Sequence, residues 1–383
     1  MRILIAGDYA PLERVSLQVA SGRFDQIFPD ELVNIIKSAD YSIVNFESPV
    51  IENNFQPITK CGPHLGCSEK SVDAIKYAGF KAVAMANNHI LDYGVEGLHK
   101  TIDTCSSSGL DVVGVGDSLQ KSQKVLYVPV KDKILAVINC CEHEFSVATD
   151  EHPGANPLNP ISIYYSIKEA RKKASFVLVI VHGGHEEYQF PSTRMQDTYR
   201  FFIDSGADAV VNHHQHCYSG FEFYNEKPIF YGLGNFCFDE VPLKADSSWN
   251  YGFMLELIFE DTIQYKIYPY NQCSKDATVK LLPADAFDSR LQELNAIINN
   301  RNKLKQEVDS YYVRTVPFEC SLLEPYRGRI FNKLFYLGLL PSMIKGKKIA
   351  SILNHLNCES HRDKMVFALH SKLQAGKKHK KNK

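Results

Sequence analysis

The sequence predicts an α/β protein, and three observations lead to this class. Short apolar runs recur between residues 2 and 268, amphipathic helical patterns lie between several of them, and polar side chains follow where the apolar runs end. Short runs that are almost continuously hydrophobic are typical of strands buried on both faces of a sheet. Strands that alternate with helices along a chain favour a largely parallel sheet.

The expected strands follow one another from the N-terminus to residue 268. They are RILIAG (2–7), YSIVNF (41–46), KAVAMA (81–86), DVVGVG (111–116), ILAVINC (134–140), FVLVIVHGG (176–184), ADAVVNHH (207–214), PIFYGLGNF (228–236) and the pair 253–259 and 262–268. Because the segments from 228 to 268 are joined by short turns, we expect them to add to the sheets as antiparallel strands.

Three segments between these strands have the pattern of amphipathic helices. They are PDELVNIIKSAD (29–40), SEKSVDAIKYAG (68–79) and PSTRMQDTYRFFIDSG (191–206). Ser68 and Ser192 are the expected N-caps of the last two helices. Gly79 and Gly206 are the residues at which these helices are expected to stop.

The character of the sequence changes near residue 280. We expect a catalytic-type domain over residues 1–275 and a helical extension over 285–383, which ends in a disordered basic tail (377–383). Residues 328–350 are apolar, aromatic and flanked by lysines, but they are too short to span a bilayer. They predict a helix that packs on the first domain or, alternatively, a helix that lies on a membrane surface or binds a partner.

The global composition is that of an ordinary soluble globular protein. The 383 residues are 44% hydrophobic and 23% charged, with a net charge of −1, so the charge balance predicts no nucleic-acid partner. Ten cysteines without a CxxC pair give no support for a zinc ribbon or a thioredoxin-type motif. The N-terminus lacks a signal-peptide pattern, so we expect a cytoplasmic location, with peripheral membrane contact through 328–350 and the basic tail as an alternative.

Five of the apolar runs end in carboxylates, amides or imidazoles. These ends are Gly7-Asp8, Asn45-Phe46-Glu47, Asn87-Asn88-His89, His182-Gly183-Gly184-His185-Glu186 and Asn212-His213-His214-Gln215-His216. In a largely parallel sheet the C-terminal strand ends meet at one edge, where ligands bind. Oxygen and imidazole ligands together suit divalent metals such as Mn²⁺, Fe²⁺ or Zn²⁺. The sequence therefore predicts a metal site, with two ions as the expected number and Glu47 as the candidate bridging carboxylate.

Each motif taken alone also has an ordinary structural interpretation. Gly7-Asp8 fits a turn with a helix-capping aspartate, and His182 before two glycines fits a tight turn. The cluster HHQH (213–216) is harder to explain by packing. The conjunction of all five motifs at strand ends is what favours a metal site.

The order of these motifs resembles the capsule-synthesis CapA family, also called the poly-γ-glutamate biosynthesis family, which is related to the calcineurin-like metallophosphoesterases. The matching stretches are GD (7–8), NFESPV (45–50), KCGPHLGC (60–67), AGFKAVAMANNHILDYG (78–94), HGGHEEY (182–188), HHQH (213–216) and KPIFYGLGNFCFD (227–239). The resemblance covers residues 1–270 and implies a four-layer α/β/β/α sandwich of two mixed sheets flanked by helices. It also implies a dinuclear metal centre at the strand ends.

The resemblance implies a role for each matching polar residue. Asp8 and His216 would bind the first metal, Glu47 would bridge the two, and Asn88, His182 and His214 would bind the second. His89 would act on the leaving group or on the charge of the transition state, with Asp92 as the group that orients it.

Three positions depart from the pattern of the related proteins. Ala10 stands where the metallophosphoesterases have a histidine, Gln215 replaces a common proline, and Gly183 replaces a common tryptophan. The missing histidine at residue 10 predicts that one metal is held weakly or that another residue completes its site.

We therefore expect a divalent-metal-dependent hydrolase of the CapA family that acts in capsule or poly-γ-glutamate-type polymer metabolism. Its expected substrate is a phosphoester or a γ-glutamyl amide bond. The alternative is an accessory protein, inactive or weakly active, that binds an anionic polymer or membrane-associated synthesis machinery. A β/α-barrel amidohydrolase is disfavoured, because its His-x-His motif belongs on the first strand and here the motif comes late.

Overall fold

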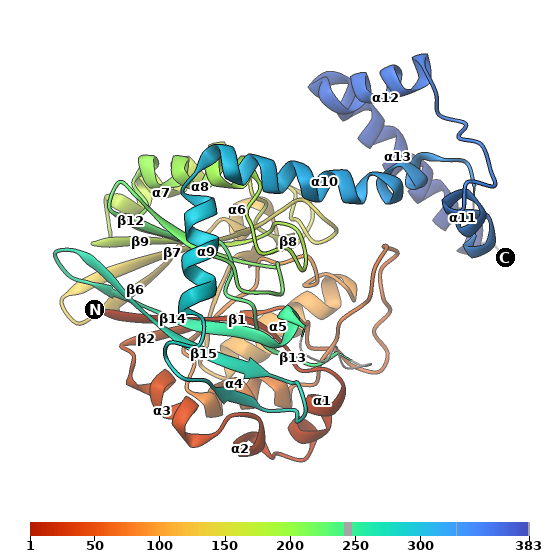
Figure 1. Cartoon of the computed structure of the whole chain (residues 1–383). Helices are drawn as coiled ribbons and strands as arrows, with labels where there is room; N and C mark the ends of the chain where they lie inside the picture. The colour runs from red at the N-terminus through yellow and green to blue at the C-terminus, as the bar shows by residue number, and fades with distance from the viewer. Residues whose placement is uncertain (241–246, 327, 382–383) are drawn as a thin grey trace. The chain divides into compact units, whose positions relative to one another are not determined.

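The structure is a computed structural model that describes residues 1–240, 247–326 and 328–381, with side chains described up to residue 372. The chain divides into two compact units, Met1–Val308 and Asp309–Lys383. The first unit contains two large sheets and the helices that cover them (Figure 1). The second unit is helical.

The first sheet has eight strands and contains the N-terminal strand near its middle. Its order is β16 (Val279–Leu281), β15 (Ile263–Gln272), β14 (Tyr251–Phe259), β1 (Arg2–Ala10), β2 (Tyr41–Phe46), β3 (Ala82–Ala84) and β4 (Asp111–Val113), and β13 (Asn235–Phe238) pairs with the end of β1. The strands from β1 to β4 run parallel, whereas β14, β15 and β16 are antiparallel. The C-terminal ends of β1 and β2 therefore meet at one edge.

The second sheet has six strands. Its order is β11 (Phe221–Tyr224), β12 (Lys227–Phe230), β10 (Ala209–His213), β9 (Phe176–His182), β7 (Lys133–Cys141) and β6 (Leu126–Val130). The four central strands are parallel, so His182 and His213 pair side by side at the ends of β9 and β10. A small third sheet joins β5 (Val115–Gly116) and β8 (Gly154–Ala155).

The prediction of antiparallel strands after residue 228 is right for only part of this region. Both β14 and β15 are antiparallel to their neighbours, but β12 runs parallel to β10 and β13 runs parallel to β1. β12 forms a hairpin with β11, and the chain then passes from the second sheet to the first, where β13 lies beside the end of β1. Short turns alone could not reveal this arrangement.

Helices cover the outer faces of both sheets, which confirms the four-layer α/β/β/α architecture (Figure 1). Those beside the first sheet are α1 (Glu13–Ala20), α2 (Phe24–Ile27), α3 (Asp30–Ser38), α4 (Lys70–Ala78) and α5 (Gly94–Ser107). Those beside the second are α7 (Pro160–Arg171) and α8 (Thr193–Ser205), and the short α6 (Leu119–Ser122) contacts the small sheet. Between the two large sheets, the rings of Phe176 and Phe259 lie 4.7 Å apart.

The ends of the helices follow the predicted signals closely. Ser192 caps α8, where its side chain accepts a hydrogen bond from the Met195 amide. Gly79 and Gly206 both end their helices with positive φ, at 103° and 116°, a conformation that favours glycine. At the start of α4, however, Glu69 is the N-cap and not Ser68.

The first unit extends beyond residue 275, where the sequence predicted its end. The β16 strand adds to the first sheet, and α9 (Asp288–Ile298) buries Leu291, Leu294 and Ile298. Asn295 Oδ1 accepts a hydrogen bond from the Phe221 amide at 2.7 Å. The segment is mostly polar, and only one face of α9 is apolar. The sequence therefore did not predict that this helix packs on the first unit.

Four helices make up the end of the chain. They are α10 (Arg301–Leu323), which continues from the first unit into the second, α11 (Arg329–Tyr336), α12 (Lys347–Asn357) and α13 (Glu359–Lys381). The backbone of the predicted disordered tail is helical as far as Lys381, and its side chains lie outside the described residues. In the part of the chain that the structure describes, no helix has the length and apolar character needed to cross a bilayer.

Candidate metal centre

Two groups of potential metal ligands meet where the ends of the two sheets face each other. One consists of Asp8, Glu47 and His216, and the other consists of Glu47, His182 and His214. Within each group the ligand atoms lie within 4.8 Å of one another. Glu47 belongs to both groups, so its carboxylate lies between the two potential ion positions.

Glu47 is the most unusual of these residues. Its side chain is fully buried, and neither carboxylate oxygen accepts a hydrogen bond from the described residues. Nε2 of His182 lies 3.5 Å from Oε1 and Nε2 of His216 lies 3.8 Å from the same oxygen. A buried carboxylate without partners is costly unless a cation compensates it, so this residue fits a metal ligand.

Asp8 is held in place by two donors. Its Oδ1 accepts from Asn45 Nδ2 at 2.7 Å, and its Oδ2 accepts from the His214 amide at 3.2 Å. Burial nevertheless raises the pKa of Asp8 to about 7, and burial followed by the charge of Asp8 raises the pKa of Glu47 well above its ordinary value. A bound cation would favour the ionised form of both carboxylates.

His182 and His214 are held in the neutral form that binds metals. Burial, and then the neighbouring His214, lowers the pKa of His182 well below its usual value, and burial also lowers the pKa of His214. Nε2 of His182 lies 3.0 Å from Asn88 Oδ1, so the two candidate ligand atoms lie close together. Nδ1 of His214 is buried without a hydrogen-bond partner among the described residues, which fits a nitrogen free to bind an ion.

The loop after β10 adopts strained backbone conformations to present these rings. The φ angles of His214 and His216 are 86° and 53°, values that are uncommon for residues other than glycine and that cluster at functional sites. Gln215 anchors the loop between them by donating to the carbonyl oxygens of Tyr188 and Phe190 at 2.9 and 3.2 Å. His216 Nδ1 lies 2.8 Å from Asn235 Oδ1, an acceptor that leaves Nε2 to face Glu47.

His89 belongs to a separate buried triad beside the metal ligands. Its Nδ1 lies 2.7 Å from Asp92 Oδ2, which also accepts from the Leu65 amide at 2.7 Å. Lys60 forms an ion pair with Asp92, and its Nζ lies 3.2 Å from His89 Nδ1. The carboxylate of Asp92 therefore orients the imidazole, and the lysine in turn holds the carboxylate.

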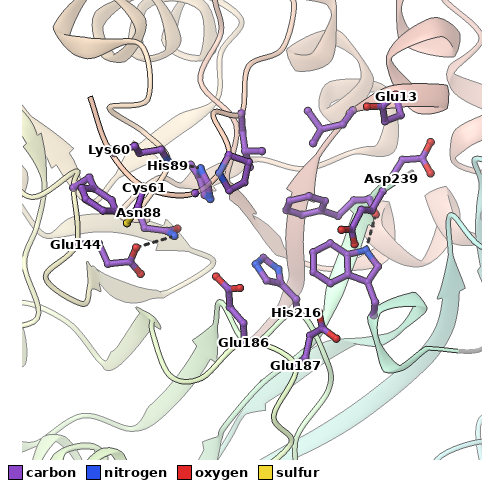
Figure 2. Close-up of a pocket in the computed structure, with 18 residues that line it drawn as sticks. Glu13, Lys60, Cys61, Asn88, His89, Glu144, Glu186, Glu187, His216 and Asp239 are labelled. Atoms are coloured by element: carbon purple, nitrogen blue, oxygen red, sulfur yellow. Dashed lines mark hydrogen bonds between the residues drawn. The ribbon is translucent and has the colours of Figure 1, made fainter. Parts of the chain in front are cut away.

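A cavity of about 500 Å³ is lined by Asn88 and His216 of the candidate ligands and by His89. Figure 2 shows Lys60, Asn88, His89 and Glu144 on one side, Glu13 and Asp239 on the other, and His216 and Glu186 between them. Carboxylates outnumber cations in this lining, and Lys60 is the sole lysine or arginine among the described residues that line it. An anionic substrate would therefore be repelled unless metal ions supplied positive charge.

Comparison with known proteins assigns the first part of the chain to a family. Residues 2–240 match the family model described as "Bacterial capsule synthesis protein PGA_cap". The chain belongs to this family. All the residues of both ligand groups lie within the matched range, and the resemblance that seven motifs implied is confirmed at the level of the family.

Two curated relatives of this PGA_cap protein come from Bacillus. The capsule biosynthesis protein CapA of Bacillus anthracis is 36% identical over 214 residues, which cover 54% of this chain and 52% of the relative. The PGA biosynthesis protein CapA of Bacillus subtilis (strain 168) is 36% identical over 210 residues, which cover 54% and 55%. The chain thus spans about half the length of the curated relatives it matches.

More distant similarities are found among solved structures. A putative 5′-nucleotidase from Staphylococcus aureus in complex with α-ketoglutarate shows 14% identity and a TM-score of 0.42, over 76% of this chain and 57% of that one. A phosphatase from Mycoplasma pneumoniae shows 14% identity and a TM-score of 0.43, over 74% and 95%.

Ala10, where the sequence departs from the metallophosphoesterase pattern, lies in a small apolar cluster. Ala10 is fully buried and packs with Leu65, Phe238 and Trp249. The ring of Trp249 lies 4.7 Å from that of His216. The immediate neighbours of Ala10 in this cluster are therefore apolar.

Glu186 offers a different way to complete the site. Together with His214 and His216 it forms a third group of potential ligands, although its own side chain is exposed. Glu186 directly follows the HGGH motif, and this position could have marked it as a candidate ligand in the sequence. The extra imidazole of His213 lies outside these groups, with Nε2 3.0 Å from the Ala6 carbonyl oxygen.

Lys60 and Glu144 were also missed as site residues. Lys60 lies in KCGPHLGC, one of the stretches that resemble the family. The resemblance implied no role for this lysine. Glu144 accepts from Asn88 Nδ2 at 3.4 Å and lies 3.6 Å from His214 Nε2. It follows β7 in an irregular segment, and no pattern in the sequence marked it.

We predict that Mn²⁺ stabilises the protein more strongly as the pH rises from about 5.5 to 8. Asp8 and Glu47 must lose protons to bind a cation, and burial raises the pKa of both, to about 7 for Asp8. Below pH 7 each proton displaced costs about tenfold in affinity per pH unit. Protonation of His182 and His214 contributes little to this pH dependence, because burial lowers the pKa of both residues.

Thermal unfolding with and without Mn²⁺ across this pH range measures the effect. The same midpoint shift at every pH would contradict metal binding by these two carboxylates.

Proposed function

We propose that this PGA_cap protein is a divalent-metal-dependent hydrolase that acts in capsule or poly-γ-glutamate-type polymer metabolism. The observation that carries the proposal is Glu47, a buried carboxylate without hydrogen-bond partners that two histidine-containing groups share. The names of the Bacillus relatives, which refer to capsule and PGA biosynthesis, support this polymer. A phosphoester or a γ-glutamyl amide is the bond we propose as the substrate.

The donor set fits two divalent ions of the Mn, Fe or Zn type. Asp8, Glu47 and His216 would hold one, and Glu47, Asn88, His182 and His214 would hold the other. When bound, such ions would polarise the substrate oxygen and lower the pKa of water, so that water attacks at neutral pH.

The protein's own residues would position the substrate and move the proton. His89 lines the cavity and Asp92 holds its Nδ1, so the imidazolium form of His89 would give its Nε2 proton to the leaving group and become the neutral ring. The carboxylates of the cavity would exclude anions from the metal-free protein. An acidic polymer would therefore bind productively only to the metal-loaded form.

A non-catalytic accessory role is the second candidate. Ala10 favours it, because the resemblance to the metallophosphoesterases puts a metal-binding histidine at this residue, and its neighbours here are apolar. Under this proposal the same cavity would bind part of an anionic polymer without cleaving it. The buried ligand groups around Glu47 weigh against it, because ions bound there would supply the chemistry of cleavage and not only a surface for binding.

A substrate screen separates the two candidates. The full chain is loaded with Mn²⁺ and assayed with p-nitrophenyl phosphate, bis(p-nitrophenyl) phosphate, γ-glutamyl p-nitroanilide and poly-γ-glutamate, beside the His214→Ala variant. We expect turnover of at least one substrate that is lost on chelation and in the variant. Polymer binding by the metal-loaded chain without any turnover would support the accessory role, and full activity in a folded His214→Ala protein would refute the site.

A further inference from the structure

The net charge of −1 conceals an uneven division of charge between the two units. Residues 1–308 contain 28 Lys and Arg against 39 Asp and Glu, whereas residues 309–383 contain 15 against 5. A strong charge asymmetry between parts of a chain is typical of contact with an anionic partner. The second unit is therefore the part of this protein to which such a partner would bind.

The second unit also exposes large apolar side chains. Those in and after α11 are Ile330, Phe331, Tyr336, Leu337, Leu339 and Met343, and Ile330 and Leu339 are 75% and 67% exposed. Along α12, Ile349, Leu353 and Leu356 are exposed at intervals of four and three residues, the spacing that places them on one face of a helix. This apolar surface is larger than scattered exposed residues would give.

The connection between α11 and α12 is ordered by contacts of its own. Glu324 accepts from the Met343 amide at 2.9 Å and from the Ser342 hydroxyl at 2.5 Å. Tyr326 donates its hydroxyl to the Pro341 carbonyl oxygen, and its ring packs on that of Phe335. These contacts fold the segment while its apolar side chains remain exposed.

Basic side chains accompany the apolar ones. Residues 328–350 contain Arg329, Lys333, Lys345, Lys347 and Lys348, and no aspartate or glutamate. All five of these side chains belong to exposed residues. Apolar and cationic groups thus alternate over the same short segment.

We propose that the segment 328–356 binds the surface of an anionic phospholipid bilayer, with α11 and α12 lying in the plane of the headgroups. Apolar side chains would enter the boundary of the acyl chains, while arginine and lysine contact the lipid phosphates. Pro341 separates the two helices, so the segment is suited to lie on a bilayer and not to cross it.

The apolar component decides between a membrane and a soluble polyanion. A nucleic acid or an acidic polymer would be recognised by the basic residues and would gain little from exposed isoleucine, phenylalanine and leucine. A bilayer uses both kinds of group. The inference is independent of the proposed hydrolysis, because none of these residues lines the catalytic cavity.

Vesicle flotation of the full chain tests the proposal. Vesicles of phosphatidylcholine with phosphatidylglycerol are compared with vesicles of phosphatidylcholine alone. The apolar variant combines Ile330→Asp and Phe331→Asp, the charge variant combines Lys345→Gln, Lys347→Gln and Lys348→Gln, and Ile161→Asp in the first unit is the matched control, since Ile161 is 71% exposed. Circular dichroism establishes that each variant keeps its helices.

We expect the full chain and the Ile161→Asp control to float with the phosphatidylglycerol vesicles. Both the apolar and the charge variants should lose at least about tenfold in bound fraction, and added salt should weaken binding of the full chain. Absence of binding by the full chain, or unchanged binding by the apolar variant, would overturn the proposal. Dimers that the apolar variant abolishes, without vesicle binding, would assign the surface to a second copy of the chain.

Discussion

Replacement of Glu47 by glutamine is expected to abolish metal-dependent hydrolysis while leaving the metal-free fold intact. The change keeps the shape of the side chain but removes the charge shared by both ligand groups. We expect a loss of about a thousandfold in kcat/KM, which corresponds to roughly 4 kcal/mol of transition-state stabilisation. Kinetics on the substrate identified by the screen measures the loss.

Thermal unfolding shows whether the role of Glu47 is functional. Both of its oxygens lack hydrogen-bond partners among the described residues, so the metal-free variant should be at least as stable as the metal-free wild type. Mn²⁺ should raise the midpoint of the wild type alone. His99→Gln, a substitution on the exposed side of α5, should change none of these quantities, and a large loss of stability in metal-free Glu47→Gln would indicate a structural role instead.

Replacement of Lys60 by methionine is expected to have the second-largest effect. Its side chain is only 2% exposed and its ion pair with Asp92 is buried. Methionine would leave the buried Asp92 carboxylate without its lysine partner, at a cost of about 3–5 kcal/mol in the free energy of unfolding. Because Asp92 would then hold His89 less well, kcat should also fall, by roughly 10–100-fold.

A double-mutant cycle separates the two effects of Lys60. In Lys60→Met combined with Asp92→Asn no buried charge remains without its partner, so most of the lost stability should return. Activity should stay low, since His89 has lost the carboxylate that orients it. Full activity in Lys60→Met would show that the lysine contributes only to stability.

The polar strand ends were predictable because they obey a simple geometric rule. Parallel strands bring their C-terminal ends to one edge, so Asp8 and Glu47 are expected together in the first sheet, and His182 beside the end of β10 in the second. The two sheets place them within reach of His214 and His216, as the ligand groups show. Helix ends such as Gly79 were equally visible, since only a few residues tolerate positive φ.

Other features depend on contacts that leave no local pattern. Lys60 and Glu144 reach the site from irregular segments, and their function depends on tertiary neighbours 29 and 56 residues away. The attachment of α9 through Asn295 and the parallel direction of β13 likewise arise from long-range packing. The periodicity of apolar residues predicts which face of a helix or strand is buried. It does not predict which distant part of the chain covers that face.

The central claim is that two ions share Glu47, and the metal content of the protein tests it most directly. The full chain, purified without chelator and reconstituted with Mn²⁺, is measured by elemental analysis beside Asp8→Asn and Glu47→Gln. We predict about two equivalents in the wild type, about one in Asp8→Asn and almost none in Glu47→Gln. The same metal content in all three proteins, or no metal in the wild type after reconstitution, would contradict the account.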